Sequence, residues 1–146
     1  MSRRWFGGGV VLVAVLLCGV LWYVLREPAL ESGVDGRLQA ALDGAVKGEA
    51  PVALAELTPF AWDRVQVFGE GDSDDEISDA VGDPVEWVPQ ATSYSLPSLW
   101  VFSKGGEAVR AVQLDVNVPV GWAGRAWTPA VKVSGGPHHN VLQLAE

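Results

Sequence analysis

The amino-acid sequence predicts an α+β protein, with an N-terminal transmembrane helix followed by a small antiparallel sheet that carries two helices on one face. Three observations support this expectation. The N-terminus is an uncharged apolar run, two later segments have helical periodicity, and valine-rich or aromatic segments alternate with glycine and proline. The order helix, strand, strand, helix, strand, strand favours helices packed on one face of an antiparallel sheet.

The run from Trp5 to Leu25 contains no charged residue over 21 positions. As a helix it would span roughly 30 Å, about the thickness of the hydrocarbon core of a bilayer. Arg3 and Arg4 precede it, so the positive-inside rule places the N-terminus in the cytoplasm and the rest of the chain outside. We therefore expect residues 1–27 to be a cytoplasmic tip and a single-pass signal-anchor in the cell membrane, and residues 28–146 to be an extracytoplasmic domain.

Two alternatives to a signal-anchor are a cleavable signal peptide and a lipoprotein signal. A cleavable signal peptide has a shorter apolar region and a small-x-small cleavage site, and the following REPALESG offers no A-x-A pattern. Lipidation of Cys18 would require small residues before the cysteine, whereas Leu16 and Leu17 precede it. A plain membrane-buried side chain is favoured for Cys18, and cleavage of the segment is left open.

The acidic residues are concentrated after the anchor. The formal net charge is −8, residues up to Glu27 carry +2, and the remaining chain therefore carries −10. Such a domain repels phosphate backbones, so nucleic acid is not expected as a partner, whereas cations or basic surfaces are. The only cysteine lies in the apolar run, so the domain cannot form a disulfide, which weakly favours a bacterial source.

The first expected element of the domain is a helix between Gly33 and Gly48, with Asp35 as N-cap. Apolar residues recur there at three- and four-residue spacing. Residues 51–57 (PVALAEL) are interpreted as a strand, and residues 62–68 (WDRVQVF) as a more convincing one.

A second helix is expected from about Asp74 to Val81, because Ser73 and Glu76 have capping-box spacing and Gly82 follows as a stop signal. Residues 83–97 are interpreted as a loop, since they contain three prolines.

Residues 99–103 (LWVFS) are the best candidate for a central buried strand. The Gly-Gly pair within residues 104–107 predicts a tight hairpin. In the returning strand, apolar residues alternate with polar ones up to Val118, so its two faces should differ in polarity. Residues 120–146 are hard to interpret, although 130–133 and 141–144 could form short edge strands.

The stretch from Trp62 to Leu114 combines a W-D pair, a valine-rich strand, a capped helix ending in glycine and a hydrophobic hairpin (WDRVQVFGEGDSDDEISDAVG, later LWVFSKGGEAVRAVQL). It resembles small bacterial membrane-anchored proteins of unknown function, over less than half of the chain. A helix ending in Gly82-Asp83-Pro84 before a hairpin is also loosely similar to the SmpA/OmlA and beta-lactamase-inhibitor-like domains. This resemblance implies a binding or assembly role rather than catalysis, and Asp63 could be functional in such a group or could be a buried or turn-stabilising carboxylate.

The acidic run from Glu70 to Asp79 suggests a calcium loop. An EF-hand counted from Asp72 would need glycine at its sixth position and glutamate at its twelfth, where Ile77 and Asp83 stand, and the capping box already accounts for the acids. The two histidines, His138 and His139, are adjacent and would point to opposite faces of an extended chain. A surface turn is favoured over a metal site there.

No motif marks an active site. The sequence lacks a G-x-S-x-G elbow and a phosphate-binding loop in the domain, and the serines nearest to apolar strands are Ser98 and Ser103. We therefore assign no catalytic, cofactor-binding or metal-ligating residue and no cofactor. Residues 28–146 contain five tryptophans. Trp62 and Trp100 lie in expected strands and are interpreted as core residues. Trp87, Trp122 and Trp127 lie in loop-like segments, where a cover over the core is favoured over a ligand contact.

Taken together, the sequence predicts a non-enzymatic binding or assembly role at the cell envelope, with an envelope protein as partner and the membrane bound through Trp5 to Leu25. A glycan- or cation-binding module and an envelope hydrolase are the alternatives. The first would place loop tryptophans around a concave surface, and the second would show a pocket with convergent carboxylates or a Ser–His pair. The oligomeric state is left open.

Overall fold

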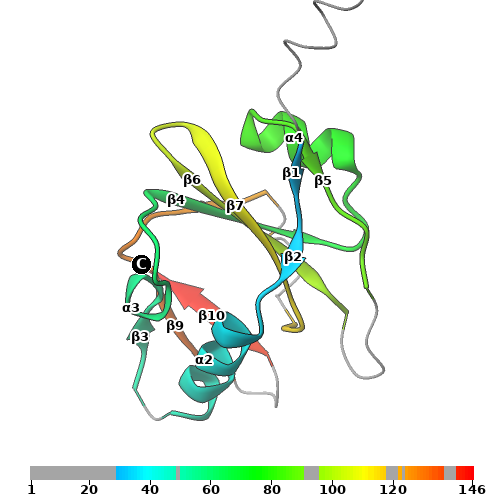
Figure 1. Ribbon diagram of the computed structural model, residues 1–146. Helices are drawn as coiled ribbons and strands as arrows, with labels where there is room; N and C mark the ends of the chain where they lie inside the picture. Colours follow the sequence, from blue (N-terminus) through cyan, green and yellow to red (C-terminus); the bar gives the residue numbers. More distant parts are fainter. Residues whose placement is uncertain (1–28, 49, 91–95, 118–121, 123, 137–140) are drawn as a thin grey trace, which may run out of the picture.

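The computed structural model describes residues 29–48, 50–90, 96–117, 122, 124–136 and 141–146, which form an α+β domain of three sheets and three helices (Figure 1). None of the helices in these residues is long and apolar enough to cross a membrane. The predicted fold class, which began with a transmembrane helix, is corrected accordingly, and the single-pass assignment is not supported. The proposed span from Trp5 to Leu25 lies outside the described residues.

The largest sheet has five strands in the order β2-β7-β6-β4-β8, and all its pairs are antiparallel except β2 with β7. The bounds are β2 Gly33–Val34, β4 Arg64–Gly69, β6 Ser98–Lys104, β7 Glu107–Leu114 and β8 Ala126–Trp127. The strands expected at 62–68 and 99–103 are thus confirmed as β4 and β6. As predicted, β6 lies in the middle, and every residue from Ser98 to Ser103 is buried.

The hairpin between β6 and β7 has the predicted two-residue turn. Gly105 and Gly106 have φ angles of 63° and 92°, which only glycine adopts without steric cost and which match the twist of the flanking strands. The turn is also held from the neighbouring strand, because the Gly105 N–H donates to the Asp63 carboxylate at 2.6 Å. Asp63 therefore has the turn-stabilising role that was one of its two structural readings.

A second sheet has the order β10-β9-β3 and packs across the first. Its strands are β3 Val52–Ala53, β9 Lys132–Gly135 and β10 Leu142–Ala145. Strands were expected at 130–133 and 141–144, but β9 pairs on both sides and is the central strand rather than an edge. The apolar side chains of both strands, Val133, Leu142 and Leu144, are buried in the larger core, so this C-terminal hairpin closes it.

The strand predicted at 51–57 is wrong beyond Ala53, because Leu54–Leu57 form the short helix α3. Alanine, leucine and glutamate all favour helix, and one long-range and one local hydrogen bond hold the turn. The Leu54 N–H donates to the Val131 carbonyl at 2.9 Å, and the Thr58 hydroxyl donates back to the Leu54 carbonyl at 3.3 Å.

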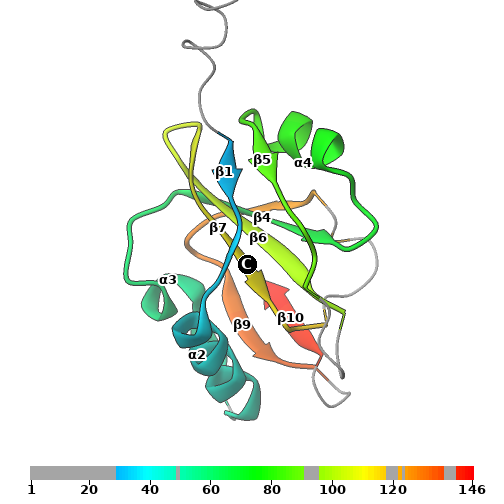
Figure 2. The same ribbon diagram turned by 45° about the vertical axis from the view of Figure 1, so that its right-hand side comes forward.

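The helices lie on opposite faces of the five-stranded sheet, which contradicts the prediction of two helices on one face (Figures 1 and 2). Helix α2 (Gly36–Lys47) and α3 pack with the second sheet against one face, and α4 (Asp74–Val81) packs against the other. The physical reason is that the central strands carry apolar side chains on both faces of the sheet, so each face must be covered. Trp100 and Phe102 point into the larger core, whereas Leu99 and Val101 point toward α4.

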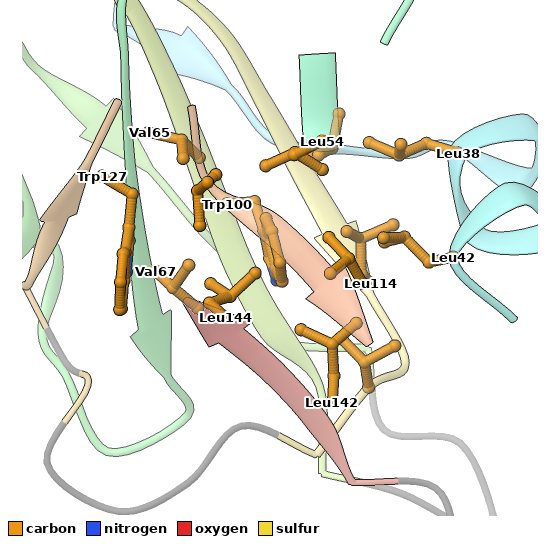
Figure 3. Close-up of a cluster of buried hydrophobic side chains, with 14 of the residues drawn as sticks. Leu38, Leu42, Leu54, Val65, Val67, Trp100, Leu114, Trp127, Leu142 and Leu144 are labelled. Carbon is orange, nitrogen blue, oxygen red and sulfur yellow. The ribbon is translucent and has the colours of Figure 1, made fainter. Parts of the chain in front are cut away.

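Figure 3 shows the larger core, where side chains from α2, α3 and both sheets point toward one another. Trp100 lies at its centre and has no exposed surface. The indole N–H of Trp100 donates to the Ser98 hydroxyl at 3.0 Å, and the one proton of that hydroxyl lies between the carbonyls of Leu114 and Val116, both within hydrogen-bond distance. Ser98 therefore satisfies polar groups that the apolar core would otherwise leave unpaired.

Both long helices begin at the predicted caps. The Asp35 carboxylate accepts from the N–H groups of Arg37 and Leu38 at 3.1 and 3.0 Å. In α4 the capping box is complete, with the Glu76 N–H on the Ser73 hydroxyl and the Ser73 N–H on the Glu76 carboxylate. Gly48 is the C-cap of α2 and Gly82 is the C-cap of α4. Gly82 has a φ of 89°, so it is a left-handed cap.

Two exposed glutamates make the stability of the domain depend on pH. The pKa of Glu76 is lowered by hydrogen bonds from Ser73, chiefly from its backbone N–H and secondly from its hydroxyl. The pKa of Glu146 is lowered in the same way by the backbone N–H and the hydroxyl of Thr128. Because the folded state favours the ionised form, this stabilisation is present above the ordinary value of 4.5 and is lost as the pH falls through the lowered folded pKa values. We expect the midpoint of thermal unfolding to decrease when the pH is lowered from 5 to 3. The decrease should be smaller in Glu76→Gln and in Glu146→Gln than in the parent chain. An unchanged pH profile in both variants would contradict this assignment.

A third, two-stranded sheet pairs β1 (Leu30–Glu31) with β5 (Val85–Glu86) in parallel. Strand β5 falls within the segment expected to be a loop, and residues 91–95 of that segment lie outside the described residues. The pairing is non-local, since the N–H groups of Leu30 and Ser32 donate to the carbonyls of Pro84 and Glu86. Residues 30–34 therefore join β5 on one side to β7 on the other.

Side chains accept hydrogen bonds from backbone N–H groups on the outer edges of β5 and β7. On β5, the Val85 N–H donates to the Ser78 hydroxyl at 3.0 Å, and on the residue after β5 the Trp87 N–H donates to the Asp74 carboxylate at 3.2 Å. On β7, the Ala108 N–H donates to the Asp83 carboxylate at 2.5 Å. Helix α4 and the residue after its cap thus supply acceptors where a neighbouring strand would otherwise pair.

Candidate functional site

A shallow groove of about 290 Å³ lies between the segment that leads into α2 and the first half of β7. Its walls are mostly aliphatic, and one arginine and one aspartate stand among them. The lining residues are Leu30, Gly33, Val34, Asp35, Val109, Arg110, Ala111 and Val112. Two of them, Val34 and Val109, are large hydrophobic residues with 66% and 44% of their surface exposed. The groove therefore presents apolar surface to solvent at a place where two distant parts of the chain meet.

Local backbone geometry forms the two walls. On one side, residues 33–34 pair with Val112 and Gln113 before the chain turns into α2 at Asp35. On the other side, the register of β7 against β6 shifts beside Phe102 and Ser103, so that Val109 is an extra residue in the ladder. A bulge of this kind re-aims the side chains next to it. Val109 and Arg110 consequently lie along the groove.

Arg110 makes two contacts of different kinds. Its Nη2 donates to the Asp35 Oδ2 at 2.8 Å, and its guanidinium lies 4.9 Å from the centre of the Phe60 ring. The other Asp35 oxygen caps α2, so this one carboxylate links the start of the helix to β7. Since the arginine side chain is 45% exposed, the ion pair is a surface feature, and it neutralises the only cation among the lining residues.

Carboxylates flank the hairpin end of the groove. Asp83 bonds to the N–H of Ala108, the residue immediately before Val109, and Glu107 precedes Ala108 at the end of the turn. Lys104 stands on the other arm of the turn, paired in register with Glu107. With Arg110 matched by Asp35, the surroundings of the apolar walls are net negative, in keeping with the −10 of residues 28–146.

The acidic run examined as a calcium loop is used for local structure. The Gly69 N–H donates to the Asp72 carboxylate at 2.8 Å, Asp74 accepts from Trp87, and Glu76 completes the capping box. In the part of the chain that the structure describes, no three or more histidine, cysteine, aspartate or glutamate residues come together as a potential metal site. His138 and His139 lie outside the described residues.

The tryptophans serve the interior. Trp62, Trp87, Trp100 and Trp127 are all buried, and Trp122 is partly buried against the larger core. The Trp87 indole N–H donates to the Gln113 side-chain oxygen at 3.1 Å. That amide also exchanges hydrogen bonds with the backbone of Gln90, so Gln113 fixes the 87–90 segment on the sheet. The reading of Trp62 and Trp100 as core residues is confirmed, and so is the reading of the loop tryptophans as covers of the core.

Ser98 and Ser103, the serines nearest to apolar strands, are both buried. The Ser98 hydroxyl is engaged with Trp100 and the backbone, and the Ser103 hydroxyl has no hydrogen-bond partner. Neither serine lines the groove.

Sequence reasoning did not find the groove. Its two exposed valines are far apart in the chain, and the bulge that directs Val109 and Arg110 depends on the pairing between β6 and β7. The one available signal was the apolar Val34 at the start of a helix, next to the Asp35 cap and outside the helical apolar pattern.

Comparison with protein-family models, with curated proteins and with solved structures found no similar protein. The resemblance of residues 62–114 to small membrane-anchored proteins and to the SmpA/OmlA and beta-lactamase-inhibitor-like domains thus stays a prediction.

Proposed function

We propose that this chain is a non-enzymatic binding domain that takes part in assembly with a partner protein through the groove between residues 30–35 and β7. The single observation that carries the proposal is that Val34 and Val109, which are 66% and 44% exposed, line the same groove. Exposed aliphatic side chains gathered around a concave surface are a common feature of protein-interaction sites. The cell-envelope location predicted from residues 1–27 stays a prediction.

The two alternatives have less support in the described residues. A glycan-binding module was expected to expose loop tryptophans around a concave surface, but Trp87 and Trp127 are buried and neither lines the groove. The groove also lacks the convergent carboxylates or Ser–His pair expected of a hydrolase, because its one carboxylate, Asp35, is bonded to Arg110 and to the backbone of α2. A binding surface for a protein segment fits these walls better.

The proposal is tested by selecting random peptides displayed on phage against the full chain. Selected peptides should bind the double variant Val34→Ser, Val109→Ser at least tenfold more weakly, about 1.4 kcal/mol, since each serine removes buried aliphatic contact. Val88→Ser is the matched control, because Val88 is 79% exposed and does not line the groove. It should leave binding unchanged, and thermal unfolding should show that all variants fold.

Two results would contradict this function. One is that no peptide is enriched over an unrelated acidic protein of the same charge. The other is that enriched peptides bind the double variant as tightly as the parent chain, which would place their site elsewhere on the domain.

A further inference from the structure

We infer that the groove takes an extended, basic segment of a partner protein, in which aliphatic side chains alternate with lysine or arginine, and that it recognises this segment through side chains rather than by adding a strand. The inference rests on the proposed function and specifies its partner.

The shape of the groove selects an extended occupant. The groove runs along extended chain: Gly33–Val34 and β7 are hydrogen-bonded parallel neighbours in one sheet, and residues 109–112 of β7 complete the lining. A segment lying along them can place successive aliphatic side chains of one face between Val34 and Val109.

The backbone of β7 is already occupied next to the groove. Residues Val112 and Gln113 pair with β2, and the Ala108 N–H is bonded to Asp83. A peptide that binds by strand addition needs a row of free N–H and C=O groups on an exposed edge. At most residues 109–111 of β7 are left for pairing, a row too short for a ladder, so the occupant is held mainly through its side chains, with the aliphatic residues of the groove supplying the apolar part.

Charge complementarity selects a basic occupant. Within the groove, Arg110 and Asp35 cancel at a separation of 2.8 Å. Beyond it, two carboxylates, Asp83 and Glu107, outnumber Lys104 at the hairpin end, and residues 28–146 together carry −10. A field of this sign attracts a cationic segment and repels a second copy of the same domain, so self-association through the groove is disfavoured.

The experiment measures binding of three synthetic peptides to the full chain by isothermal titration calorimetry. The peptides are blocked five-residue chains in which valine alternates with lysine, serine or glutamate. We expect the lysine peptide to bind about tenfold more tightly than the serine peptide at low salt, with the difference shrinking in 1 M NaCl, because salt screens exposed charges. The glutamate peptide should bind more weakly than the serine peptide.

Two further comparisons address the mode of binding. Methylating the backbone nitrogens of the lysine peptide should leave its affinity within about threefold, since the peptide backbone makes no ladder here. Glu107→Gln should weaken the lysine peptide about twofold to threefold and leave the serine peptide unchanged, as expected for an exposed charge at the rim.

The outcomes separate this inference from the proposed function. If serine and lysine peptides bind equally and both lose affinity in Val34→Ser, Val109→Ser, the groove is a binding site but the basic partner is wrong. A large loss on backbone methylation would mean strand addition and would overturn the side-chain mode. If sedimentation of the protein alone shows a dimer that the double valine variant abolishes, the occupant is a second copy. If all peptides bind the double variant as tightly as the parent, the proposed function itself fails.

Discussion

Replacing Trp100 by alanine is expected to lower the free energy of unfolding by about 3–5 kcal/mol, the range for large-to-small changes of a buried aromatic residue. Trp100 has no exposed surface and lies at the centre of the larger core, on the middle strand of the five-stranded sheet (Figure 3). Its loss leaves a cavity between the two sheets and removes the indole donor from the Ser98 hydroxyl. Urea denaturation at pH 7 measures the effect, provided the variant still folds in buffer.

Val109→Ala is the matched control for this change, because Val109 lies on the adjacent strand β7 and is 44% exposed. Its expected effect is within about 0.5 kcal/mol, as for surface positions in general. Equal effects of the two substitutions would mean that Trp100 does not occupy the core. Trp100→Phe, which keeps most of the volume and loses the N–H, should fall between them.

Replacing Gly135 by alanine is expected to lower the free energy of unfolding by about 1–3 kcal/mol, the usual cost of forcing extra volume into a packed contact. A Cβ at this position in β9 would overlap the carbonyl oxygen of Val46 in the last turn of α2. That oxygen belongs to the backbone, so the helix and the strand must move apart to accept the methyl group. Thermal or urea unfolding of the variant measures the cost.

Gly44→Ala provides the opposite expectation within the same helix. Nothing lies within 4 Å of a Cβ built on Gly44, an exposed position inside α2, and alanine favours helix over glycine by about 1 kcal/mol. This variant should therefore be more stable than the parent chain. If Gly135→Ala were as harmless as Gly44→Ala, α2 and β9 could not be in the close contact described above.

Elements with a strong local signal were predicted well. Helix α4 has a complete capping box and a glycine stop, and the β6–β7 turn has two glycines, so a few neighbouring residues determine each of them. Strand β6 is nearly continuous in apolar residues, which is characteristic of a strand buried on both faces.

The errors arose where distant pairings decide the structure. Strand β5 exists because residues 30–32 lie beside it, and proline-rich surroundings gave no sign of that partner. The placement of both helices on one face followed from fold-class reasoning, but Leu99 and Val101 already required a cover on the second face. Gln113, which the alternation of the returning strand places on the polar face, is buried and bonds to Trp87 and Gln90.

The candidate site was beyond sequence reasoning for the same reason. Val109 looks like an ordinary member of an alternating strand, and only the shifted register against Phe102 directs it to the groove. Val34 and Arg110 approach each other because β2 pairs in parallel with β7, and a two-residue strand has no periodicity that a sequence pattern could reveal.

Resistance to fibril growth is expected to depend on helix α4. Two carboxylates and one hydroxyl from this helix and its C-terminal end bond to the outer edges of β5 and β7. Ser78 and Asp74 belong to α4, and Asp83 follows its cap, so three N–H groups that a foreign strand would need are bonded while the helix is folded. Local opening of α4 would release all three bonds together and uncover adjacent backbone of two strands. The tendency of the protein to aggregate should therefore follow the fraying of this eight-residue helix, well before the larger core unfolds.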